Sequence, residues 1–214
     1  RVYLPPTAEH IEAAMKSQPQ WKPEFPLPDN PRNFNTPAYG LDTYDKIFTP
    51  RQLVALTTLS DLVQEARERV LEDALAAGME DDRRGLEEGG RGARAYAEAI
   101  ATYLAIAVDR LADYSSSICV WHVTRDTIAH TFGRQAIPMT WDFAEVNPFS
   151  NSTGNFMGGV ERVVASLELL PASDRGLAKM LDATESINGV DRPIVFTDPP
   201  YYDNIGYADL SDFF

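Results

Sequence analysis

The chain has 214 residues, 44% of them hydrophobic, and a formal net charge of −13. This length suffices for one globular domain with an appendage, and the acidic balance disfavours a major nucleic-acid clamp, because phosphate binding needs clustered Lys and Arg. It does not exclude an enzyme whose basic, nucleic-acid-binding surface lies elsewhere in the protein.

The cysteine content and the hydropathy of the chain indicate the cellular compartment of the protein. The single cysteine, Cys119, excludes a disulfide framework. No apolar run approaches a membrane span and no signal peptide is visible, so we expect a cytoplasmic protein without a membrane partner. Because the first residue is Arg1 rather than Met, we expect a fragment of a longer protein or a processed chain.

Residues 1–48 form an irregular, proline-rich segment. The prolines are too dense for long helices. We nevertheless expect the segment to pack on a surface rather than remain free, because its aromatic residues include Trp21, Phe25, Phe34, Tyr39 and Tyr44.

Residues 49–114 predict an inserted helical hairpin. Thr49 can cap a helix that opens at Pro50 and continues to about Ala77. A second helix is predicted from about Ala93 to Tyr114, after a charged tip between the two. The apolar faces predicted for the two helices are Leu53, Leu56, Leu59, Leu62 and Val63, and Tyr96, Ile100, Tyr103, Leu104, Ala107, Val108 and Leu111.

Residues 115–214 predict a partial α/β core. Ile118 to Ile128 is compatible with a strand or a further helix, and residues 132–150 have little periodicity. A helix is expected from Asn155 or Phe156 to Leu170. Its predicted buried face is Val160, Val163, Val164, Leu167 and Leu170. We further expect a short helical turn over Leu177–Leu181, a strand over Ala183–Ile187 and a last, buried strand over Ile194–Thr197.

The motif Asp198-Pro199-Pro200-Tyr201 follows that last strand. Open α/β sheets place their chemistry at the carboxyl ends of strands. A carboxylate and a backbone carbonyl can hold both hydrogens of an exocyclic base amine, whose delocalised lone pair makes it a poor nucleophile. Proline fixes φ and has no competing N–H, and an aromatic ring gives a flipped base a stacking face. The alternative is a plain proline-rich turn.

The run Thr197–Tyr207 resembles the catalytic segment of the amino-methylating DNA methyltransferases, which act on adenine N6 or cytosine N4. With Ala208–Phe214 it is similar to the large adenine-specific DNA methylases that carry an N-terminal domain of unknown function (DUF1156). Two earlier runs resemble the same family: Phe48–Leu53, and Phe132–Met139 continuing through Asn147-Pro148-Phe149.

The resemblance implies part of a Rossmann-like sheet, S-adenosylmethionine as methyl donor and, in the complete protein, DNA as partner. It implies direct methyl transfer to a flipped base, with adenine N6 favoured. Asp198 and the Pro199 carbonyl would orient the amine, Tyr201 would stack on the base, and Tyr202 and Asp203 would position the motif or flank the base. Restriction or defence-system proteins are further implied partners.

The methyl-donor half of such a site departs from the family pattern. The family binds S-adenosylmethionine at a strand followed by an Asp-Pro-Phe-x-Gly-x-Gly turn, which we expect upstream of residue 1. The nearest candidate here, residues 147–154, lacks the leading acid and the first glycine. Its sequence is compatible with a cofactor loop or with a polar loop that caps the next helix. We therefore assign no cofactor-binding residue, although Asp198 would lie next to the donor, and expect the isolated fragment to be inactive.

Three further patterns have both a functional and a structural interpretation. Cys119-x-x-His122 is half of a zinc site or a packed thiol beside an ordinary histidine; we predict no metal site. The pairs Arg51-Gln52 and Arg134-Gln135 either touch phosphate or a base edge, or form surface ion pairs. The motif itself leaves two alternatives to a DNA enzyme: a methyltransferase acting on RNA or a protein amide, and a non-catalytic binding or scaffold module.

Overall fold

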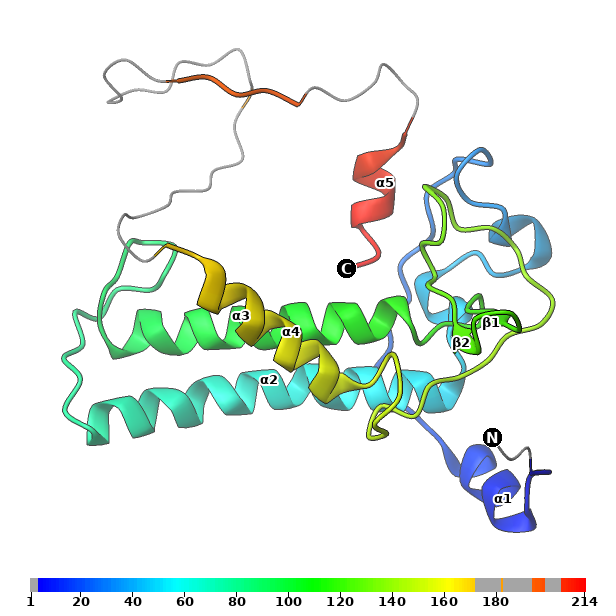
Figure 1. Ribbon diagram of the computed structural model, residues 1–214, viewed down its shortest axis with the longest axis horizontal. Helices are drawn as coiled ribbons and strands as arrows, with labels where there is room; N and C mark the ends of the chain where they lie inside the picture. Colours follow the sequence, from blue (N-terminus) through cyan, green and yellow to red (C-terminus); the bar gives the residue numbers. More distant parts are fainter. Residues whose placement is uncertain (1–3, 172–181, 183–193, 199–204) are drawn as a thin grey trace.

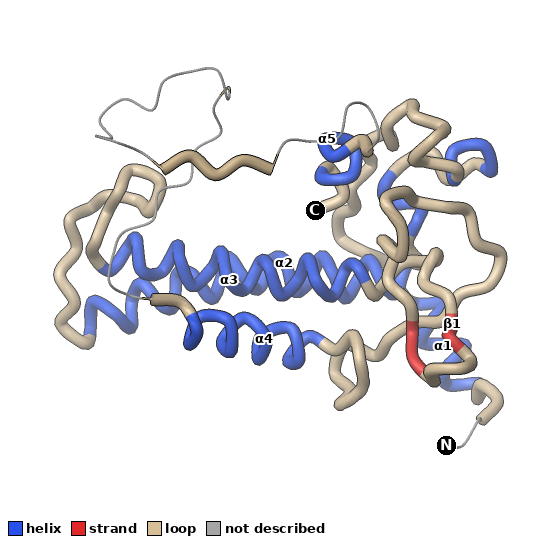
Figure 2. The backbone as a smooth tube through the Cα atoms, turned by 45° about the horizontal axis from the view of Figure 1, so that its top comes forward, coloured by secondary structure: helices blue, strands red, loops and turns tan. Residues whose placement is uncertain are grey.

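The computed structural model describes residues 4–171, 182, 194–198 and 205–214. Long helices form one half of this part of the chain, and loops, short turns and a small hairpin form the other (Figure 2). None of its helices is long and apolar enough to cross a membrane. The elements are α1 (Ala8–Lys16), the 3-10 turns η1 (Thr36–Tyr39) and η2 (Tyr44–Ile47), α2 (Pro50–Ala76), α3 (Ala93–Asp113), β1 (Trp121–His122), β2 (Thr127–Ile128), α4 (Phe156–Leu169) and α5 (Tyr207–Ser211).

The predicted helical hairpin is present: α2 and α3 lie antiparallel and side by side (Figure 1). Its first helix begins as the sequence indicates, because the Thr49 side chain accepts a hydrogen bond from Gln52 N while the Gln52 side chain accepts one from Thr49 N at 2.7 Å. The interface differs from the predicted stripe. The buried face of α3 is largely alanine, and both Tyr96 and Leu62 are exposed. Short side chains allow the two backbones to approach closely, which leaves the larger rings at the surface. The buried residues of α3 are Ala93, Ala95, Ala97, Ala101, Ala107 and Leu111.

The third long helix, α4, crosses α3 through a glycine contact (Figure 1). A Cβ added at Gly159 would lie 3.3 Å from the Ala107 carbonyl oxygen, so glycine permits the close approach. Gly159 is the buried residue of this helix. The predicted apolar face is wrong in part, because Val164 and Leu170 are exposed, whereas Val160, Val163 and Leu167 are partly buried.

The proline-rich segment contributes most of one hydrophobic core. Leu27, Phe34, Tyr44 and Ile47 are buried there together with Ile118 and Ile137. The expectation that this segment packs on a surface is confirmed for Phe34 and Tyr44, whereas Trp21, Phe25 and Tyr39 remain largely exposed. The segment also contains the nine-residue helix α1, none of whose residues is buried.

The sheet of the described residues does not have the predicted Rossmann-like form. It consists of the antiparallel pair β1–β2, with Trp121 opposite Ile128, so the region Ile118–Ile128 forms a small hairpin. Ile194–Thr197, predicted as a buried strand, is irregular and exposed: Ile194 and Phe196 are 97% and 98% accessible. A strand needs a hydrogen-bonded neighbour, and its apolar composition alone cannot supply one. The helix predicted at 177–181 and the strand predicted at 183–187 lie outside the described residues.

We predict that Thr49→Ala lowers the free energy of unfolding by about 1–2 kcal/mol, because it removes the cap of α2 and the hydroxyl that donates to Glu145 at 2.8 Å. Chemical denaturation followed by circular dichroism measures this change. Thr7→Ala is the matched control, since Thr7 also forms a capping box but caps α1, which buries nothing. Equal losses from both variants would contradict the role given to Thr49.

Candidate functional site

The predicted catalytic motif is only partly within the described residues. Asp198 is described, and it is exposed at the end of the equally exposed run Ile194–Thr197. The other predicted catalytic and substrate-binding residues, Pro199, Pro200, Tyr201, Tyr202 and Asp203, lie outside the described residues. Their geometry therefore stays a prediction, and the described chain resumes at Ile205.

Residues 205–214, downstream of the motif, dock on the loop-rich half of the protein through an aromatic cluster. The Phe213 ring lies 4.8 Å from the Phe132 ring, 5.8 Å from Phe48 and 6.5 Å from Tyr44, measured between centroids. Phe214 adds a further contact with Phe132 at 5.4 Å. Tilted and edge-to-face rings at these separations attract one another beyond the area they bury.

This cluster joins the three runs for which the sequence predicts a resemblance to the methylase family. Phe48 opens the first run, Phe132 opens the second and Phe213 belongs to the third. The three residues are separated by more than eighty positions at each step, so sequence proximity does not explain the convergence. Folding brings one aromatic residue from each run to the same place.

A polar contact fixes the other end of the same segment. The Asn30 side-chain amide donates to the Asp209 carboxylate at 2.9 Å. Gly206, at the N-terminal end of α5, lies so close to Asn33 that a Cβ there would collide with the Asn33 side-chain amide. These contacts hold α5 against the proline-rich segment. The sequence had no signal for them beyond the aromatic content of that segment.

The two Arg-Gln pairs have different environments. Arg51 forms an ion pair with Glu145, and Gln52 is buried in the capping box of α2. The first pair therefore has a structural role. Arg134 and Gln135 are exposed in the loop that follows Phe132, which leaves their predicted contact with phosphate or a base edge open.

Residues 147–154 form a turn that leads into the cap of α4. The Asn155 carboxamide accepts from Gly158 N at 2.7 Å and donates to Ser152 O at 2.6 Å. Gly154 has φ +88°, and a Cβ there would meet Val146 and Tyr114. Two cavities touch this run: one of about 160 Å³ beside Gly154, and one of about 620 Å³ lined by Asn147 and residues 150–153. The hydrogen bonds of Asn155 show that the run leads into a helix cap, and cavity volume does not separate this interpretation from a cofactor loop.

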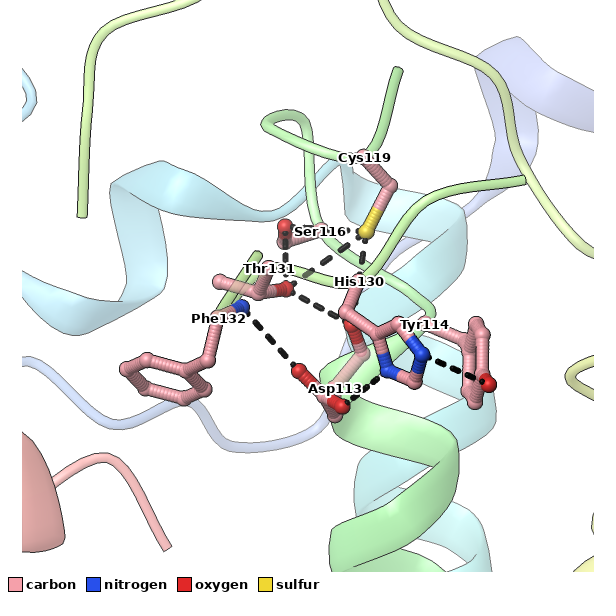
Figure 3. A network of polar contacts seen from close by, with 7 residues as sticks. All are labelled: Asp113, Tyr114, Ser116, Cys119, His130, Thr131 and Phe132. Carbon is pink, nitrogen blue, oxygen red and sulfur yellow. Dashed lines mark hydrogen bonds and ion pairs between the residues drawn. The ribbon is translucent and has the colours of Figure 1, made fainter. Parts of the chain in front are cut away.

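The residues of the possible half zinc site separate in the structure. The Cys119 thiol is fully buried and lies 3.4–3.5 Å from Ser116 Oγ, Thr131 Oγ1 and the Asp113 carbonyl, whereas His122 is exposed on β1 (Figure 3). The described part of the chain contains no group of three His, Cys, Asp or Glu side chains arranged to hold a metal.

A polar network that sequence inspection missed surrounds this thiol (Figure 3). Asp113, the last residue of α3, contacts His130 Nδ1 at 2.6 Å and accepts from Phe132 N at 3.2 Å. His130 Nε2 lies 3.0 Å from the Tyr114 hydroxyl. Every member of the network has a partner within the protein. The network ties the end of α3 to Thr131 and to the backbone of Phe132. Its chemistry is therefore that of a structural clamp which holds the aromatic cluster in place.

Comparisons with protein-family models, curated proteins and solved structures gave no match. The resemblance to the methylases therefore remains a prediction carried by the residues themselves. The aromatic cluster and the Asn30–Asp209 hydrogen bond come from the structure of this chain and have no counterpart from a matched protein.

The environment of Tyr44 predicts that the stability of the fold depends on pH in the alkaline range. Burial, reinforced by the nearby charges of Asp212 and Asp209, raises the pKa of Tyr44 to about 12, and its buried hydroxyl has no hydrogen-bond partner among the described residues. The folded state therefore holds the Tyr44 proton more tightly than the unfolded state, whose tyrosines titrate near 10. This stabilisation is complete below pH 10 and is lost as the pH rises from about 10 to 12.

We expect Tyr44→Phe to leave stability at pH 7 unchanged or higher, because it removes an unpaired polar atom. It should also reduce the alkaline loss of stability by on the order of 2 kcal/mol. Denaturation curves at several pH values, with tyrosinate absorbance near 295 nm, measure both effects. Tyr39→Phe, at an exposed ring, is the control. An alkaline profile of Tyr44→Phe identical to that of the unaltered protein would contradict the prediction.

Proposed function

We propose that this chain is part of an S-adenosylmethionine-dependent DNA methyltransferase that methylates an exocyclic base amine, with adenine N6 as the favoured target. Asp198 and the Pro199 carbonyl hold the two amino hydrogens, and Tyr201 stacks on the flipped base. Tyr202 and Asp203 flank that base or support the motif. DNA binds to the complete protein.

The convergence of the three family-like runs is the observation that supports this proposal. Phe48, Phe132 and Phe213 pack together although they come from three separated segments. A chance match in one proline-rich turn would give no reason for its downstream residues to meet the other two runs. The contact supports a shared architecture for the runs and leaves the chemistry to experiment.

The proposed reaction is a direct displacement. The amine nitrogen would attack the donor methyl carbon while the bond from that carbon to the sulfonium sulfur breaks, with its electron pair left on sulfur, and the methylated amine would release one proton to water. The protein contributes by orienting the amine and by keeping the nitrogen in line with the methyl group. No covalent intermediate with the protein forms. The donor supplies only the methyl group, and no described residue is assigned to its binding.

A non-catalytic binding module is the second candidate, because Ile194 and Phe196 are almost completely exposed. Exposed apolar runs of this kind mark interaction sites. Calorimetry with S-adenosylmethionine tests whether residues 1–214 contain a complete donor site. We expect no tight binding by these residues alone; tight binding would show that the donor site is complete and would contradict the non-catalytic candidate.

We predict that Asp198→Ala in the complete protein lowers methyl transfer to DNA on the order of 100-fold or more, because the amine loses its principal acceptor. Transfer of a labelled methyl group from S-adenosylmethionine to DNA, RNA and protein measures the effect and the substrate class.

Asp73→Ala is the control for charge, since Asp73 is exposed on α2. DNA methylation that persists undiminished in Asp198→Ala would overturn the assignment of the motif. Transfer to RNA or protein with none to DNA would retain the chemistry and replace the substrate.

A further inference from the structure

The cavity of about 160 Å³ beside Gly154 is lined by two arginines and, among the described residues, by no acidic side chain. Arg110 comes from α3 and Arg162 from α4. Neither guanidinium group forms an ion pair with a described residue. Two uncompensated positive charges therefore line one cavity, in a chain whose formal net charge is −13.

We propose that this cavity, called here the arginine cavity, binds a phosphate group through Arg110 and Arg162. The ligand is inorganic phosphate, or the phosphate of a nucleotide or of a DNA backbone; the tetrahedral oxyanion is common to all three. Phosphate binding at this place requires no methyl transfer, so it goes beyond the proposed function and can hold or fail separately from it.

The close contact between α3 and α4 brings the two arginines together. A Cβ added at Gly159 would lie 3.3 Å from the Ala107 carbonyl oxygen, and each arginine follows this contact by three positions on its own helix. Residues three positions apart share a helix face. The two helices run in opposite directions (Figure 1). Because helical side chains lean toward the N-terminus of their helix, both arginine side chains lean back toward the crossing point.

Arg110 is oriented by the ring of Tyr114. Its guanidinium carbon lies 5.6 Å from the centre of that ring, which is a cation–π contact. The Tyr114 hydroxyl lies 3.0 Å from His130 Nε2, and His130 Nδ1 lies 2.6 Å from Asp113, so the ring itself is held (Figure 3). A guanidinium group that is already oriented loses less freedom when it binds an anion, which favours binding.

The volume and the rest of the lining fit a phosphate group. The cavity is several times the roughly 30 Å³ of a water molecule and smaller than the roughly 300 Å³ at which pockets for whole ligands begin. A nucleotide would therefore place only its phosphate here. Asn151, Ser152 and Thr153 add neutral side chains that can donate hydrogen bonds. Arginine suits phosphate because its planar guanidinium donates two parallel hydrogen bonds.

The alternative is that the arginines serve only the helices. A cation in the last turn of α3 is favoured by the helix dipole, which explains Arg110 without a ligand. It does not explain Arg162, which lies in the N-terminal half of α4. The N-terminus of α4 adjoins the cavity, but Asn155 already accepts from Gly158 N there at 2.7 Å. The two guanidinium groups therefore supply the positive charge, and an anion between them relieves their repulsion.

Titration of the 214-residue chain with inorganic phosphate tests the site, by calorimetry and by the rise in melting temperature that a ligand of the folded state causes. We expect saturable binding of phosphate and none of chloride at equal ionic strength, which controls for screening. Arg110→Gln and Arg162→Gln should each weaken phosphate binding at least tenfold, because each removes a charged hydrogen-bond donor. Arg110→Lys keeps the charge without the planar fork and should weaken it less. Arg94→Gln is the matched control, since Arg94 is exposed on α3 and should leave binding unchanged.

A 5′-mononucleotide and a short DNA duplex identify the source of the phosphate. DNA binding that inorganic phosphate competes away and that Arg162→Gln weakens assigns the arginine cavity to the DNA backbone. Binding of inorganic phosphate and mononucleotide without competition by DNA assigns it to a free ligand. Both results support the site.

The site is overturned if the unaltered chain binds no phosphate, or if Arg110→Gln and Arg162→Gln leave binding unchanged. Equal weakening by Arg94→Gln, or an equal response to chloride, also overturns it. Because Arg162 is exposed, Arg162→Gln should keep the fold, which circular dichroism verifies, and this variant decides alone if Arg110→Gln unfolds the chain. All of these results leave the methyltransferase proposal intact. A complete protein that binds phosphate here and methylates neither DNA, RNA nor protein overturns only the proposed function.

Discussion

One buried seam, between the proline-rich segment and residues 117–137, determines how the rest of the structure is arranged. Ile47 and Ile137 are completely buried in it. Backbone hydrogen bonds cross it from Ser117 N to Ile47 O at 2.8 Å and from Ile137 N to Asn33 O at 2.6 Å. Buried backbone groups must be paired, so these bonds fix the register as well as the contact. These bonds help to order a segment rich in proline, because Asn33, Asn35 and Ile47 find backbone partners across the seam.

Contacts next to the seam fix the start of α2, the end of α3 and the rings against which α5 docks. Helix α2 starts two residues after Phe48, and its start is joined to the far loop because Glu145 accepts from Thr49 and pairs with Arg51. A carboxylate near a helix N-terminus is also favoured by the helix dipole. At the other side, Asp113 ends α3 and holds the backbone of Phe132. Two of the rings that receive Phe213 are therefore fixed by the same contacts that terminate the hairpin.

Local structure could be predicted from the sequence, and long-range contacts could not. The starts of α2 and α4 were predictable because caps act within four residues: Thr49 with Gln52, and Asn155 with Gly158. The buried face of α4 was not, because it depends on which part of the helix reaches α3. The predicted strand over 194–197 was wrong in the described structure for the same reason, since β-branched and apolar residues indicate a strand only where a neighbouring strand is available.

The candidate site shows the same division. Asp198 was identified from its motif, and Phe48, Phe132 and Phe213 lay within the runs that carry the family resemblance. Their contact required the fold, as did the Asn30–Asp209 hydrogen bond across nearly the whole chain. Aromatic content predicts that rings will be buried or paired but not with which partners, because packing is decided by shape rather than composition.

The negative charge of the chain is unevenly distributed, so the net charge alone does not describe each part of its surface. Residues 61–90 contain ten acidic and four basic residues, which account for −6 of the net −13. They belong to the distal part of the hairpin and its tip, at the opposite end of the long helices from α5 and the loop-rich half (Figure 1). The exposed Arg134 and Gln135 instead lie two and three positions after Phe132, the ring that Phe213 contacts. Much of the acidity of the chain therefore belongs to the hairpin rather than to the loop that carries Arg134.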